Sequence, residues 1–400
     1  MKRFFVFFFI FLFTSFQVFS SDLEALKREV EHLRNLKFKE KIKFEYVSDK
    51  QISDILKKEM TRQFSVNKFE NYETALKVFW LIPKKSNLKS LVENLMSSQA
   101  AGIYDPKSKK MYILEFSSEP EDDEFFELSK ALNLNEIFIV HELAHAITDQ
   151  NFDLEKSLKL ENIENEDRQS AGLAVAEGDA TMVMMKYLAK TMNLGVDNFS
   201  EISEVMGDAN FYGEFLGETI PRYLRETLIF AYTDGFKFVN AISKGSDTKK
   251  IDGLYRKPPE STEEIIHPEK YLNQNDKPKE VKTIWEEIKK YGALEKVWEG
   301  TWGELGTRII LEEWGADSDK ATLASTGWGG DRYIVYKTTE GDFSFFWRSL
   351  WDSEKDAKEF EEVVSIKKEI AVSRKGNEVV VMKRKVKTGN EKSDSKNKLQ

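Results

Sequence analysis

Two histidines stand four residues apart in segment 139–146, which reads IVHELAHA. On a helix this spacing places both side chains on one face, about one turn apart, so His141 and His145 can bind the same metal ion. Glu142 follows the first candidate ligand, where its carboxylate can act as general base on a metal-activated water. The alternative is a helix with incidental histidines. The segment is apolar, however, and buried imidazoles without partners would cost free energy.

The chain contains no Cys, so a bound metal ion must be held by His, Asp or Glu. A catalytic zinc site needs a third protein ligand and leaves its fourth position to water. Thr148 and Asn151 occupy the positions where the compact metzincin pattern requires Gly and His. The third ligand is therefore expected further along the chain.

Glu177 is the candidate third ligand. It stands in segment 174–181, AVAEGDAT, where an acidic pair interrupts an otherwise apolar helix. Burying carboxylates is costly unless they are ionically engaged, and a metal ion would engage Glu177. Gly178 and Ala180 are small, which would let this helix approach the helix of His141 closely. The expected cofactor is Zn²⁺.

Four further residues are candidates for supporting roles. Asp149 and Asp179 could orient the metal-bound imidazoles, or could instead cap a helix or form a salt bridge. His267 and Tyr232 could each stabilise the oxyanion of a tetrahedral intermediate. The structural alternatives are that His267 only follows a capping box in segment 261–268, STEEIIHP, and that Tyr232 is a core aromatic residue.

The pairing of HELAH with a downstream Glu-Gly resembles the gluzincins, metallopeptidases with His-Glu-x-x-His on one helix and a Glu ligand on a later one. The resemblance implies that Glu177 is a ligand, that Glu142 is the base and that the reaction is hydrolysis of a peptide bond. The Gly-x-Met-Glu-Asn element of the aminopeptidase branch is missing, which favours an endopeptidase.

A wider resemblance covers most of the chain after residue 20. It is to an uncharacterised group of exported bacterial proteins regarded as metallopeptidases. This resemblance implies an architecture but no substrate. The matching stretches are 102–106, 141–150, 177–180, 258–271 and 327–331.

Two long helices, 135–151 and 167–190, are expected to carry the site. A strand-turn-strand hairpin at 102–114 precedes them, and its second strand, 110–114, either pairs with an extended substrate or is buried. The Gly-rich segment 327–331 is expected to be a structural loop. The fold class is α+β: a zincin-like, mainly helical domain with a small mixed sheet. Further expected elements are helices 22–36, 51–64, 87–95, 222–242, 279–290 and 353–364, and strands 43–47 and 378–382.

Residues 1–20 have the pattern of a signal peptide, with Lys2 and Arg3, an apolar run and Ser20 at the cleavage position. We expect a catalytic domain at 21–386, with an α+β lead-in at 21–95, and a disordered polar tail at 387–400. The expected location is periplasmic or extracellular. After cleavage no segment is long and apolar enough to span a membrane.

The chain carries 60 basic and 69 acidic residues, mixed along its length without a basic stripe. This pattern argues against nucleic-acid binding and leaves a protein or peptide as the expected partner, with the oligomeric state open. The function predicted from the sequence is zinc-dependent peptide-bond hydrolysis. Two alternatives are an exported binding or assembly protein with a structural zinc site, and a zinc amidase acting on cell-wall peptides.

Overall fold

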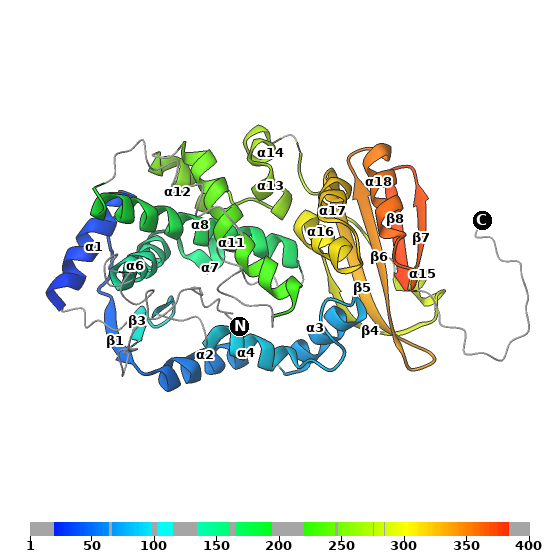
Figure 1. Cartoon of the computed structure of the whole chain (residues 1–400), viewed down its shortest axis with the longest axis horizontal. Helices are drawn as coiled ribbons and strands as arrows, with labels where there is room; N and C mark the ends of the chain where they lie inside the picture. Colours follow the sequence, from blue (N-terminus) through cyan, green and yellow to red (C-terminus); the bar gives the residue numbers. More distant parts are fainter. Residues whose placement is uncertain are drawn as a thin grey trace, which may run out of the picture.

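The computed structural model describes residues 20–63, 66–97, 102–114, 134–160, 165–193, 220–244, 247–274, 276–283 and 285–383. The expected signal peptide, apart from Ser20, and the expected tail lie outside these residues. Two lobes lie side by side, a helical one and one built on a sheet (Figure 1). Among the described helices none is long and apolar enough to cross a membrane.

The helical lobe is built around three long helices, and the expected bounds of these helices are correct to within one residue. They are α6 (Leu134–Phe152), α8 (Glu166–Thr191) and α11 (Arg222–Ser243). The other helices of this lobe are α1 (Ser20–Arg34), α7 (Leu154–Ser157), α12 (Thr248–Arg256), α13 (Thr262–Ile266) and α14 (Pro268–Asn273). Helix α8 packs between α6 and α11.

Helices α8 and α11 touch backbone to backbone. A Cβ atom added to Gly178 would lie 2.2 Å from the carbonyl oxygen of Gly235, and one added to Gly235 would lie 2.2 Å from that of Ala174. Gly178 therefore serves the approach of α8 to α11, and the expectation that it faces the helix of His141 is wrong. This contact fixes the turn of α8 that carries Glu177.

A three-stranded mixed sheet lies beside α6, as expected. Its order is β1 (Lys43–Val47), β3 (Lys110–Leu114) and β2 (Gly102–Asp105), with β1 parallel and β2 antiparallel to β3. Strand β3 is central and paired on both sides, so the expectation that it pairs with a substrate is wrong. The strand next to α6 is β2. Helices α2 (Asp49–Gln63), α4 (Leu88–Ser97) and α3 (Val66–Val78) run along the lower edge of the molecule toward the second lobe (Figure 1).

The second lobe is a five-stranded antiparallel sheet of order β4-β5-β6-β8-β7, of which the sequence predicts one strand. The strands are β4 (Ala293–Gly300), β5 (Trp328–Thr338), β6 (Phe343–Trp351), β7 (Ile370–Lys375) and β8 (Glu378–Lys383). Helices α16 (Gly303–Glu313), α17 (Ser318–Ser325) and α18 (Glu354–Val364) accompany it. Of the helix expected at 279–290, only α15 (Trp285–Lys289) forms. The α+β class is confirmed.

Residues 328–331 form the start of β5 with a bulge, and of the segment expected as a loop only Gly327 lies in a turn. Asp331 is buried and accepts four hydrogen bonds, from the backbone N–H groups of Trp302 and Gly303 and from the indole N–H groups of Trp328 and Trp347. Because each carboxylate oxygen has two donors, Asp331 ties β5, β6 and the start of α16 together.

The first turn of α8 is anchored at the junction of the two lobes. Glu166 accepts hydrogen bonds from Trp298, from Tyr333 and from the backbone N–H of Thr301, and Asp167 accepts two from Thr262. Both carboxylates also stand at the N-terminus of a helix, where negative charge is favourable. The second lobe thereby holds one end of the helix that carries Glu177.

Candidate metal centre

Helix α6 presents His141 and His145 on one face, and α8 brings Glu177 against them. The Nε2 atoms of the two histidines are 2.8 Å apart, and Glu177 Oε2 lies 3.2 Å from His141 Nε2 and 3.4 Å from His145 Nε2. The histidines are fully buried, and Glu177 is 3% exposed. The three residues form a group that could hold a metal ion.

The spacing of the three atoms fits a small tetrahedral ion. Bonds of about 2.0 to 2.1 Å in a tetrahedron place neighbouring ligand atoms about 3.3 Å apart. The observed separations of 2.8 to 3.4 Å span that value. Two imidazole nitrogens and a carboxylate oxygen are a donor set that zinc accepts, with one position left over. The residues present therefore fit the expected cofactor.

The protonation states of His141 and Glu177 suit metal binding, whereas His145 must give up a proton to a metal, because Glu177 outweighs burial and raises the pKa of this ring. Burial, together with the neighbouring His145, lowers the pKa of His141 to about 3, so this ring is neutral. Burial alone would raise the pKa of Glu177, but the two imidazoles outweigh it and lower that pKa below its usual range. A neutral imidazole and an ionised carboxylate are the forms that ligate metals.

Glu142 is buried beside the triad and is held from one side only. Its Oε2 atom accepts a 2.7 Å hydrogen bond from the backbone N–H of Tyr104 in β2. No donor among the described residues contacts Oε1. Burial raises the pKa of this carboxyl to about 8 in the metal-free chain. A buried oxygen without a donor is costly, so its presence beside a ligand set calls for a chemical role.

Asp149 and Asp179 make strong contacts away from the ligand atoms. Asp149 accepts from the Tyr104 hydroxyl at 3.1 Å and from Lys109 Nζ at 2.6 Å, which ties α6 to the β2–β3 hairpin. Asp179 accepts from Arg34 Nε at 2.8 Å and from the Tyr255 hydroxyl at 2.7 Å. These contacts match the salt-bridge alternative for both residues. Their orienting role toward the imidazoles stays a prediction.

The two candidates for oxyanion stabilisation occupy different places. The Tyr232 ring on α11 is buried, with its centroid 6.4 Å from that of His141. His267 lies between α13 and α14, and its Nε2 atom is 3.0 Å from Glu304 Oε1 in α16. The structure places Tyr232 near the triad, whereas His267 contacts Glu304 of the sheet lobe. Both catalytic roles stay predictions.

The sequence did not single out Tyr104, Arg34 or Gly235. Tyr104 acts through its backbone N–H, which no residue type signals. Arg34 is 1% exposed and forms a salt bridge with Asp179. The pattern of an amphipathic helix places charged residues in solvent, so nothing in the sequence indicates that this Arg is buried. Gly235, inside a predicted helix, was a usable signal, because a helical Gly often marks a close packing contact.

A second acidic group, Glu263, Asp276 and Asp352, has carboxylate oxygens within 4.8 Å of one another. The ammonium group of Lys270 sits among them, 2.6 Å from Glu263, 2.6 Å from Asp276 and 3.2 Å from Asp352. The lysine already supplies the positive charge that these carboxylates need. The group is therefore an ion-pair cluster.

Comparison with protein families gives one partial match, to a domain of unknown function (DUF8575) over residues 293–387. That segment corresponds to the five-stranded sheet with α16, α17 and α18. The comparisons with curated proteins and with solved structures find no match. The candidate metal centre lies in the helical lobe, outside the matched segment.

Proposed function

We propose that the protein is an exported zinc-dependent metallopeptidase whose metal is held by His141, His145 and Glu177. The observation that carries the proposal is the unpartnered Oε1 atom of Glu142, buried next to the three ligand atoms. A structural zinc site needs its ligands but has no use for this carboxylate. A hydrolytic site needs a base at this position.

When zinc is bound at this triad, it lowers the pKa of water toward 7 and polarises a carbonyl group as a Lewis acid. Glu142 accepts the proton of the attacking water and passes it to the leaving amine. The N–H of Tyr104 fixes one carboxylate oxygen, so the other has a defined position. Burial raises the pKa of Glu142 to about 8, and the positive charge of a metal held by His141, His145 and Glu177 would lower it.

Strand β2 supplies a backbone edge beside this base. The N–H of Tyr104 points to Glu142 and away from β3, so the backbone groups of Gly102 point to the same side, since alternate residues of a strand share their direction. A Cβ atom added to Gly102 would lie 3.8 Å from Glu142 Cγ. The backbone of β2 on this side is therefore engaged with the base, because the N–H of Tyr104 is taken by Glu142.

The test is cleavage of casein by the purified chain from Ser21 to Gln400 with one equivalent of zinc. The matched variant is Glu142→Gln, which keeps the shape of the side chain and all three ligands. We expect the unmutated protein to cleave casein, and Glu142→Gln to bind zinc without cleaving. A second variant, Glu177→Ala, should lose both zinc and activity.

Other results would favour the alternatives. If both proteins bind one zinc ion and neither cleaves casein nor cell-wall peptides, the site is structural and the peptidase proposal fails. Cleavage of cell-wall peptides alone, again dependent on Glu142, would assign the amidase. Export is part of the proposal and is tested separately, by the N-terminal sequence of the mature protein, which should begin at Ser21.

A further inference from the structure

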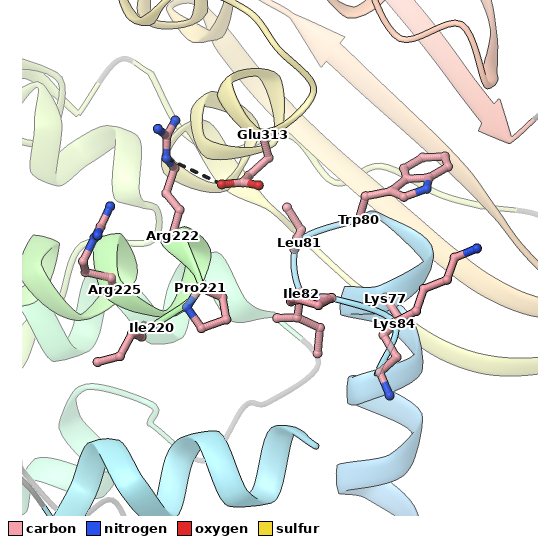
Figure 2. Close-up of a pocket in the computed structure, with 11 residues that line it drawn as sticks. Lys77, Trp80, Leu81, Ile82, Lys84, Ile220, Pro221, Arg222, Arg225 and Glu313 are labelled. Carbon is pink, nitrogen blue, oxygen red and sulfur yellow. Dashed lines mark ion pairs between the residues drawn. The ribbon is translucent and has the colours of Figure 1, made fainter. Parts of the chain in front are cut away.

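A cleft of about 630 Å³ lies at the junction of the two lobes, and none of the triad residues lines it. One wall is the end of α3 and the loop after it, with Trp80 and Lys84. The other is the start of α11, with Arg222 and Arg225, next to Glu313 at the end of α16 (Figure 2). Apolar side chains, among them Leu81 and Ile82, lie between these walls.

The cleft is positively charged although the whole chain carries a net charge of −9. Its lining holds four cations and one carboxylate. Lys77 is paired with Glu73 at 2.6 Å, and Arg222 with Glu312 at 3.3 Å. For Lys84 and Arg225 no carboxylate within ion-pair distance occurs in the described part of the chain.

Further ammonium groups gather around Trp80. Lys367 Nζ lies 4.5 Å and Lys383 Nζ 5.8 Å from the centre of its ring. Burial, and then repulsion from Lys84, lower the pKa of Lys383. Like charges held together in this way repel one another, and an anion bound between them would relieve the repulsion.

Helix α11 connects the cleft to the metal centre. Arg225 precedes Tyr232 by seven residues, nearly two full turns, so both stand on the same face, about 10 Å apart along the axis. The Tyr232 ring contacts that of His141.

We propose that the cleft binds a carboxylate of the substrate, with Arg225 and Lys84 as its charge partners. The carboxylate is either the C-terminus of the peptide or an acidic side chain. Trp80, Leu81 and Ile82 contact the apolar part of the same residue. This inference rests on the proposed function for the identity of the ligand, but its charge preference can be measured as binding alone.

The experiment measures calorimetric binding to the zinc-loaded Glu142→Gln protein, which does not turn over. The probes are acetyl-heptaalanine with a free C-terminus, the same peptide as its amide, and amides carrying one Glu at each position in turn. We expect the carboxylate-bearing peptides to bind roughly tenfold or more tightly than the plain amide. If the peptide with the free C-terminus binds most tightly, the cleft binds the C-terminal carboxylate. If an amide with Glu at one position binds most tightly, the cleft binds an acidic side chain.

Substitution of the cleft residues should remove the preference. In Arg225→Gln the preference for carboxylate-bearing peptides over the plain amide should disappear, and in Lys84→Gln it should become smaller. Arg225→Lys should keep part of this preference. Lys249→Gln, on the exposed side of α12, is the matched control and should keep the full preference. Thermal unfolding of each variant shows whether it is folded.

The outcomes separate this inference from the proposed function. If casein is cleaved but the plain amide binds as tightly as the carboxylate peptides, the cleft inference is wrong and the peptidase stands. A carboxylate preference that survives both Arg225→Gln and Lys84→Gln also overturns it. If carboxylate peptides bind through Arg225 but nothing is cleaved, the cleft binds anionic peptides and the peptidase proposal fails.

Discussion

Two buried carboxylates, one in each lobe, are treated differently by their surroundings. Asp331 in the sheet lobe has two hydrogen-bond donors on each oxygen. Glu142 in the helical lobe has one donor on one oxygen, and none of the described residues donates to the other. A saturated carboxylate holds elements together, while an unsaturated one retains the capacity to take a proton. Within the described residues Asp167 and Glu304 also keep one oxygen without a donor, but of these three carboxylates only Glu142 lies beside the ligand triad.

The largest expected effect is on the rate of the reaction. Glu142→Gln should lower the peptidase rate by a factor on the order of 10² to 10⁴, because a general base contributes about that much. The unfolding free energy of the metal-free protein should not fall, since the variant removes an unsatisfied buried carboxyl. Initial rates and urea unfolding measure the two quantities. A clear loss of stability would assign Glu142 a structural role like that of Asp331.

The converse change should affect stability and spare the metal. Asp331→Ala leaves four buried N–H donors without an acceptor and should lower the unfolding free energy by about 3 to 5 kcal/mol. Zinc affinity at low temperature, where the protein remains folded, should change little. Urea unfolding and a zinc titration with a competing chelator check this. Loss of zinc binding from the folded variant would contradict the separation of the two roles.

The contact between α8 and α11 tests how the triad is positioned. Gly178→Ala should cost about 2 to 3 kcal/mol of stability and weaken zinc binding, because the added Cβ meets the backbone of Gly235 beside Glu177. The matched control is Gly253→Ala on α12, where an added Cβ meets nothing within 4 Å. That change should raise stability by about 0.5 to 1 kcal/mol. Equal effects of the two substitutions would show that the contact is not tight.

The last expected effect is a dependence of stability on pH. Burial raises the pKa of Asp331 to about 6, above its ordinary value of 3.8. The native state therefore holds this proton more tightly than the unfolded state. The resulting stability is present below pH 4 and is lost as the pH rises through 6, by on the order of 3 kcal/mol. The difference in unfolding free energy between the unmutated protein and Asp331→Asn should become smaller from pH 4 to pH 7. A difference that grows with pH would show that the fold lowers the pKa of Asp331.

Much of the helical lobe could be predicted from local pattern. The bounds of α6, α8 and α11 follow from apolar periodicity and are correct to within one residue. The sheet lobe was largely missed, because its strands pair with partners distant in sequence and carry Trp, Gly and charged residues that blur the alternation of a half-buried strand. Segment 327–331 illustrates this: its glycines predict a loop, whereas the bulge between Trp328 and Gly330 accommodates Gly329 and Gly330 in β5.

The sequence by itself determined the two imidazoles and the neighbouring carboxylate of α6, because their relative positions depend only on the helical repeat. It also indicated Glu177, because an acidic residue in an apolar helix needs a partner. Only the tertiary structure decided that Tyr104, 38 residues before Glu142, fixes that carboxylate, and that Arg34 pairs with Asp179 across 145 residues. Such contacts depend on how distant segments pack, and no local pattern encodes them.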